Sequence, residues 1–123
     1  MTYELTWHES KKALRLTLSG DYLLEEAKEV NRRMLDELET SQMPLLILID
    51  ATHMNRSYRF SDIRTAQTFM DHLKLKAIYV ATNDRLVKLS MMIIFNLSRA
   101  SFYICDDVEK ATLMLQKQLA ALR

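Results

Sequence analysis

The sequence contains few residues that break regular structure. Its 123 residues include one glycine, Gly20, and one proline, Pro44. A glycine-rich linker is therefore excluded, and so is a glycine loop that wraps a nucleotide phosphate. The Gly-x-Ser-x-Gly turn that exposes a nucleophilic serine is excluded for the same reason. We expect one domain spanning residues 1–123.

Cysteine is equally scarce, because Cys105 is the only one and cannot form an internal disulfide. It ends an apolar segment and has no lysine or histidine next to it, which favours a buried small residue over a nucleophile.

The first residues lack the basic and then apolar run of a signal peptide. The most apolar stretch, Leu86–Leu97, is shorter than the roughly 20 residues that a membrane helix needs. We expect a cytoplasmic protein without membrane insertion.

The chain also lacks an excess of charge of one sign. Lysine and arginine total 17, aspartate and glutamate total 16, and the formal net charge is +1. No overall field attracts phosphate backbones, so nucleic acid is not an expected partner. Hydrophobic residues make up 49% and charged residues 27%, a composition typical of a folded chain and not of a disordered one.

Two kinds of apolar pattern predict the strands. Apolar and polar residues alternate in Tyr3–Trp7 and again in Leu14–Leu18, which predicts an antiparallel hairpin joined by His8–Lys12. Continuous apolar runs predict three strands buried on both faces. These runs are Leu45–Ile49, Ala77–Ala81 and Phe102–Cys105.

Apolar residues at steps of three and four predict four helices between and after these strands. The expected helices follow Asp21 as N-cap up to Leu38, span Ser61–Leu73, span Asn83–Arg99, and run from Asp106 to Leu122. The order is β-β-α-β-α-β-α-β-α, and strands that alternate with helices pair in parallel. We predict an α/β fold with a mixed five-stranded sheet and a parallel core.

This order resembles the STAS domains of anti-sigma-factor antagonists, and more closely their SpoIIAA-like relatives. The resemblance rests on Leu45–Asp50 at the centre and on Phe102–Ile104 followed by Asp106, Glu109, Ala111 and Leu115. It implies a functional region in the loop after Asp50 and at the start of the next helix. In phosphorylated members of the family a serine at that helix start is the switch.

The resemblance makes Ser61 the nearest counterpart of the switch serine, with Ser57 as a second phosphoacceptor candidate. Asp62 follows Ser61 where the family has a serine or threonine and then a glycine, and the preceding loop is extended. This departure favours the uncharacterised relatives as the better comparison.

Ligands of open α/β sheets bind outside the carboxyl ends of the parallel strands. The predicted rim gathers mostly polar residues: Asp50, Thr52, His53, Thr82, Asn83, Asp84, Asp106 and Asp107. Ser61, Asn83 and Asp106 are equally explained as helix N-caps.

The loop after this strand places Arg56 and Arg59 before the helix start, with Arg64 one turn further. Guanidinium groups beside free helix amides favour an anion, although solvated loop arginines explain them as well. His8, His53 and His72 show no metal-ligand spacing, and we expect no metal and no cofactor.

The helix predicted at Asn83–Arg99 is more apolar than one contact with a sheet requires. Leu86, Leu89 and Ile93 lie on the stripe expected to dock on the sheet. Val87, Met91 and Ile94 widen this stripe, and Met92 and Phe95 lie on the side shared with Lys88 and Arg99. Met91, Met92 and Phe95 are candidates for an interface, since methionine adapts to irregular contacts. A deeply buried helix is the alternative.

Three functions are compatible with these residues. The first is a non-enzymatic regulatory or protein-interaction module that presents the loop Thr52–Ser61 and this helix to a protein partner or to a second copy. The second is a carrier or sensor that holds a small anionic or lipid-like ligand against the sheet. The third is an enzyme of unknown reaction, for which the sequence offers isolated polar groups only.

Overall fold

The structure is a computed structural model and describes residues 3–55, 60–95 and 100–121. In these residues five strands form one sheet in the order β1-β2-β3-β4-β5. The strands are β1 (Tyr3–Glu9), β2 (Ala13–Gly20), β3 (Leu45–Met54), β4 (Leu75–Ala81) and β5 (Ser101–Cys105). The first pair is antiparallel and the other three pairs are parallel, which confirms the predicted mixed sheet with a parallel core.

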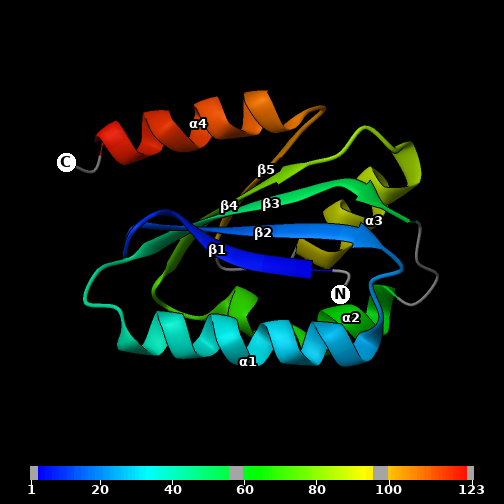
Figure 1. The fold of residues 1–123 in the computed structure, drawn as a ribbon, viewed down its shortest axis with the longest axis horizontal. Coiled ribbons are helices and arrows are strands. Elements are labelled where there is room, and N and C mark those ends of the chain that lie inside the picture. Colours follow the sequence, from blue (N-terminus) through cyan, green and yellow to red (C-terminus); the bar gives the residue numbers. More distant parts are fainter. Residues whose placement is uncertain (1–2, 56–59, 96–99, 122–123) are drawn as a thin grey trace.

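Helices cover both faces of this sheet. They are α1 (Leu24–Thr40), α2 (Phe60–Ala66), the short 3-10 helix η1 (Thr68–Asp71), α3 (Arg85–Phe95) and α4 (Val108–Ala121). Figure 1 shows α1 and α2 on one side of the sheet and α4 on the other. Residues of α1, η1 and α3 share one buried apolar cluster, so α3 belongs to the α1 side. The predicted element order is confirmed, with η1 as an addition.

The central strand β3 divides the core in two. Leu45, Ile47 and Ile49 face α1, whereas Leu46 and Leu48 face α4. All five side chains are buried because the strand is covered on both faces, which is why it reads as a continuous apolar run. The last strand in the order, β5, pairs with β4 alone among the described strands.

The ends of β3 and α2 differ most from the prediction. β3 continues five residues past Ile49, because pairing with β2 carries on to the partners Ser19 and His53. The helix predicted at Ser61–Leu73 ends at Ala66. Gln67 has a non-helical ψ of 64° there and buries its side chain, so the chain restarts as η1.

The helix caps lie one or two residues from the predicted positions. Asp84, not Asn83, caps α3, and its carboxylate accepts hydrogen bonds from the amides of Leu86 at 2.9 Å and Val87 at 3.2 Å. Asp107, not Asp106, caps α4 through a 2.8 Å bond from the Lys110 amide. In each case the side chain closest to the free amides makes the cap.

The other two predicted caps are also displaced. The N-cap position of α1 is Leu23, without a side-chain hydrogen bond, and Asp21 instead accepts a 2.9 Å bond from the amide side chain of Asn55. α2 begins at Phe60, which places Ser61 inside its first turn. The Asp21–Asn55 bond joins the ends of β2 and β3 and so uses the acceptor that a cap would need.

The turn between β1 and β2 contains a backbone outlier. Lys11 has a φ of 61°, a left-handed conformation that glycine adopts without penalty and other residues disfavour. The turn is closed by a 3.0 Å bond from the amide of Lys12 to the carbonyl of Glu9.

Among the described residues, no helix is both long enough and apolar enough to cross a membrane.

Candidate functional site

Asp50, the central residue of the predicted rim, lies on the α4 side of β3 and is only 6% exposed. One carboxylate oxygen accepts bonds from the amide of Thr52 at 3.1 Å and from its hydroxyl at 2.6 Å. The other oxygen lies 3.4 Å from the guanidinium of Arg15 on β2. The carboxylate is therefore engaged by its own strand and by the neighbouring strand.

Apart from Thr52, no described rim residue makes a hydrogen bond or ion pair with Asp50. His53 is exposed, Thr82 is buried, and Asp84 is engaged in capping α3. Among the described residues no three histidine, cysteine or acidic side chains are grouped as metal ligands.

Most of the predicted anion-binding loop has no described position. Arg56, Ser57 and Arg59 lie outside the described residues, and so does the side chain of Ser61. Asp62 is half-buried in α2. Arg64 lies 3.4 Å from the carboxylate of Asp71, so an ion pair within this region already occupies its guanidinium.

The predicted docking stripe of α3 is wrong. Val87 and Met91 point into the core, whereas Leu86 and Leu89 are exposed. Met91, predicted as an interface residue, is therefore part of the α1-side core, because the helix is rotated so that positions 87 and 91 face the sheet. Met92 is exposed as predicted, and the side chain of Phe95 lies outside the described residues.

The rotation of α3 leaves an apolar surface beside the edge of the sheet, which we call the α3–β5 surface. It consists of Leu86, Leu89 and Met92 of α3 with Phe102 and Ile104 of β5. The three helix side chains are 49%, 55% and 51% exposed. A groove of about 410 Å³ lies between helix and strand and is lined by Lys88, Met92, Phe102 and Ile104.

The charge in this groove is balanced within the chain. The ammonium of Lys88 donates a 2.8 Å hydrogen bond to the carboxylate of Asp106. This bond, with the positive charges of Lys88 and Lys110, lowers the pKa of Asp106 below its usual range. The cation in the groove lining is therefore neutralised by a neighbouring anion.

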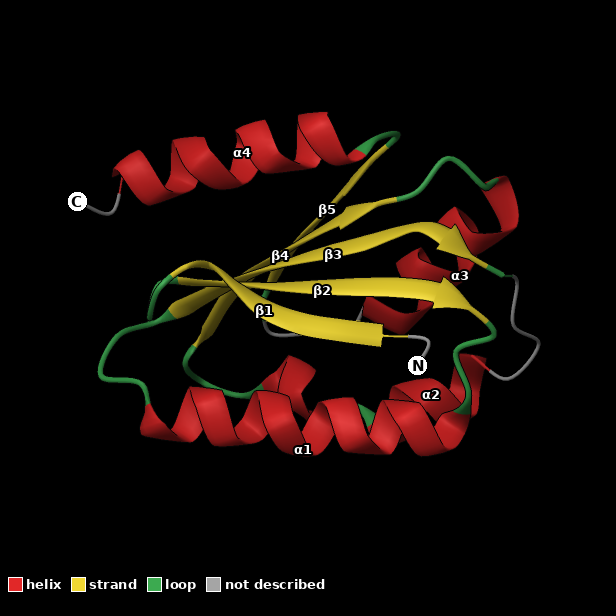
Figure 2. Cartoon of the chain, viewed as in Figure 1, coloured by secondary structure: helices red, strands yellow, loops and turns green. Residues whose placement is uncertain are grey.

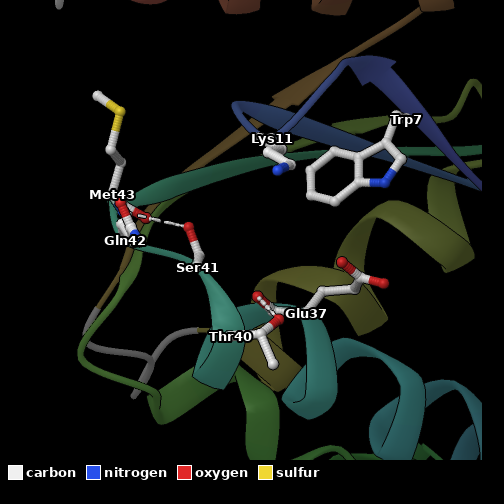
Figure 3. Close-up of a pocket in the computed structure, with 7 residues that line it drawn as sticks. All are labelled: Trp7, Lys11, Glu37, Thr40, Ser41, Gln42 and Met43. Atoms are coloured by element: carbon white, nitrogen blue, oxygen red, sulfur yellow. Dashed lines mark hydrogen bonds between the residues drawn. The ribbon is translucent and has the colours of Figure 1, made fainter.

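A second hollow lies between the β1–β2 turn and the carboxyl end of α1, and we call it the hairpin groove. Its volume is about 390 Å³, and it is lined by Trp7, Lys11, Glu37, Thr40, Ser41, Gln42 and Met43. Figure 3 shows Trp7 and Lys11 on one wall and Glu37 with Thr40 on the facing wall. Trp7 is the last apolar residue of the alternating pattern before the turn, and it is 37% exposed.

Cys105 ends β5 on the α4 side, as its position after an apolar run predicts. Burial first, and then the negative charges of Asp107 and Asp106, raise the pKa of its thiol. Its sulfur lies 3.3 Å from the thioether of Met114 on α4. These surroundings keep the thiol protonated and support the predicted role as a buried small residue.

Comparison with known proteins identifies the fold. No family model matches the sequence, and no curated protein matches it. Among solved structures, an uncharacterised protein of the DUF3478 family from Shewanella loihica PV-4, described as having a SpoIIAA-like fold, superposes with a TM-score of 0.67. The match covers 92% of this chain and 91% of that chain. The chain has a SpoIIAA-like fold. With 14% sequence identity, the likeness concerns the fold alone.

The SpoIIAA-like fold agrees with the resemblance seen in the sequence. Its five-stranded sheet places the residues after Asp50 at one end and the hairpin turn at the other (Figure 2). The α3–β5 surface lies at the β5 edge of the sheet and is apolar. The hairpin groove lies at the end with the hairpin turn and is lined by two charged residues, Lys11 and Glu37.

Proposed function

We propose that this SpoIIAA-like chain is a non-enzymatic interaction module whose α3–β5 surface binds a second copy of the chain. The observation that carries the proposal is the exposure of about half of each of three large side chains, Leu86, Leu89 and Met92, on one helix face. Adjacent exposed apolar side chains at the edge of a domain are typical of protein contact surfaces.

The shape of the surface favours a second copy as the partner. In a two-fold dimer the same patch must supply both the protruding and the receiving part of the contact. Leu89 is 55% exposed on α3, and Met92, three residues further along the helix, lines the groove with Ile104. Two antiparallel α3 helices can each place Leu89 in the groove of the partner subunit.

The charges also favour self-association. A patch with charge of one sign would repel its copy, and like charges brought together at an interface disfavour association. The Lys88–Asp106 pair instead offers one charge of each sign at the border of the groove. Two copies can approach without leaving either charge unpaired.

The geometry of the rim supports a structural role for its main acid. Asp50 accepts a hydrogen bond from Thr52 and pairs with Arg15, and Asp84 accepts hydrogen bonds from the first amides of α3. On this proposal these carboxylates shape the carboxyl end of the sheet, and recognition takes place at the surface of α3 and β5.

The experiment replaces one side chain of this surface and compares it with a matched leucine elsewhere. Leu89→Glu places a charge at the centre of the proposed contact, while Leu113→Glu changes a leucine of α4 that is 62% exposed. Sedimentation velocity of the full chain should show a dimer for the unchanged protein and for Leu113→Glu, and a monomer for Leu89→Glu. Thermal unfolding checks that both variants are folded.

Two results contradict the proposal. One is a monomer for the unchanged chain at concentrations up to about 100 µM, well above the dissociation constant of a stable contact. The other is equal dissociation of Leu89→Glu and Leu113→Glu, which would locate the contact elsewhere.

A further inference from the structure

We infer that the hairpin groove binds a small zwitterion, with its ammonium end at Glu37 and Trp7 and its anionic end at Lys11. The groove lies at the amino end of the parallel strands, where the hairpin turn approaches the carboxyl end of α1 (Figures 2 and 3). Its volume of about 390 Å³ lies within the usual range of small-molecule sites.

The two charged side chains of the groove have no partner among the described residues. Neither the ammonium of Lys11 nor the carboxylate of Glu37 makes a hydrogen bond or ion pair with them. Elsewhere on α1, Arg32 pairs with Asp36 at 3.6 Å and Lys28 pairs with Glu25 at 3.8 Å. Opposite charges that face one hollow from different walls are the arrangement that a molecule with both charges satisfies.

The cationic end of the ligand is assigned to the α1 wall. Glu37 is half-buried and its carboxylate is open to the groove. Glu37 is the one acid among the described residues that line the groove, so its carboxylate is the anionic group available to a ligand. The indole of Trp7 adds an aromatic face, which attracts ammonium groups and especially quaternary ones.

The anionic end is assigned to the hairpin wall. Lys11 occupies a left-handed position in the turn, where glycine would be relaxed. Residues held in such conformations concentrate at functional positions, since the surrounding structure must maintain them. Here the conformation places the lysine side chain at the groove beside Trp7 (Figure 3).

The two hydroxyl groups of the facing wall are already satisfied. The hydroxyl of Thr40 donates to the carbonyl of Asp36 at 2.8 Å, and the hydroxyl of Ser41 donates to the carbonyl of Met43 at 2.6 Å. The amide of Met43 donates back to Ser41 at 3.2 Å. The groups that remain open in the groove include the two opposite charges on facing walls, and this favours a ligand that carries both charges.

The test uses the fluorescence of Trp7, which is the only tryptophan of the chain. Phosphocholine serves as the zwitterionic probe, choline as the cation alone and inorganic phosphate as the anion alone. Phosphocholine should change the emission in a saturable way and bind more tightly than either single charge. Co-sedimentation with phosphatidylcholine vesicles then distinguishes a lipid headgroup from a free solute as the source of this chemistry. Absence of saturation by phosphocholine together with absence of vesicle binding would overturn the inference.

Two variants separate the two ends of the site. Glu37→Gln should weaken phosphocholine about tenfold, the usual effect of losing one charge-assisted contact, and should weaken choline equally. Lys11→Gly should weaken phosphocholine to a similar degree and leave choline unchanged, and it also relaxes the turn, so loss of folding cannot explain the result. Glu39→Gln, an exposed neighbour outside the groove, is the control and should bind as the unchanged chain does.

Equal binding of phosphocholine by Lys11→Gly, Glu37→Gln and the unchanged chain would overturn the assignment of the two ends. The inference is independent of self-association, because the hairpin groove and the α3–β5 surface share no residue. The monomeric variant Leu89→Glu should therefore bind phosphocholine with unchanged affinity.

Discussion

The side chain of Gln67 donates a 2.9 Å hydrogen bond to the hydroxyl of Tyr22, 45 residues earlier in the chain. Both residues are buried. The bond ties the segment before α1 to the break between α2 and η1. Burial raises the pKa of the Tyr22 hydroxyl above its ordinary range.

Removal of this hydroxyl should destabilise the fold. Tyr22→Phe leaves the buried amide of Gln67 without its acceptor, and we expect the free energy of unfolding to fall by about 1–3 kcal/mol. Urea denaturation measures the change. Tyr103→Phe is the control, because Tyr103 is exposed and its ring, stacked on Tyr79 at 5.1 Å, is retained. Equal stability of the two variants would show that the Gln67 bond contributes nothing.

The raised pKa of Tyr22 also predicts a dependence on pH. In the unfolded chain its hydroxyl ionises near pH 10, as an ordinary tyrosine does, whereas in the folded chain it stays protonated to higher pH. Its contribution is therefore complete below about pH 10 and is lost as the pH rises further. Urea denaturation at about pH 9 and about pH 11 should show a smaller loss of stability for Tyr22→Phe than for the unchanged chain. A larger loss in the variant would reverse the sign and contradict the burial effect.

Replacement of Asp50 tests its structural role. Asp50→Ala removes the acceptor of the Thr52 amide and hydroxyl and one partner of Arg15, and we expect a loss of about 2–3 kcal/mol in the free energy of unfolding. Asp36→Asn, which breaks an exposed pair with Arg32, should change it by less than about 1 kcal/mol. A stable Asp50→Ala protein would instead indicate a carboxylate that the fold does not require.

The caps of α3 give a test of adjacent residues. Asp84→Ala removes the acceptor for the amides of Leu86 and Val87 and should lower the free energy of unfolding by about 1 kcal/mol. Asn83→Ala, one residue earlier on an exposed site, should have little effect. The melting temperatures of the two variants decide between the observed cap and the one that the sequence suggested.

The architecture could be predicted because the sheet leaves a strong signal in the sequence. β3 is buried on both faces and reads as an unbroken apolar run, while β2 is half-covered and alternates. The rotation of α3 could not be predicted in this way. Leucine, methionine and isoleucine occupy both of its faces, so periodicity fits several rotations, and packing of Val87 and Met91 selects one.

The break after α2 escaped prediction for a different reason. Gln67 is a good helix former, so the sequence carries no signal of the break. Tertiary bonds hold the chain there, from Gln67 to Tyr22 and from the amide of Phe69 to Asn31. The hairpin groove could not be predicted because Glu37 is distant in sequence from Trp7 and Lys11, and the fold brings the hairpin turn and the end of α1 together.

Among the described helices, α4 alone covers one face of the sheet. Leu46, Leu48 and Tyr79 are buried beneath Ala111, Leu115 and Leu119, which are the last apolar residues of that cluster in chain order. During synthesis on the ribosome, all five strands emerge before the helix that shields this face. This face of the nascent sheet is therefore apolar and exposed until Leu119 leaves the exit tunnel. In that interval chaperones or neighbouring nascent chains have access to it.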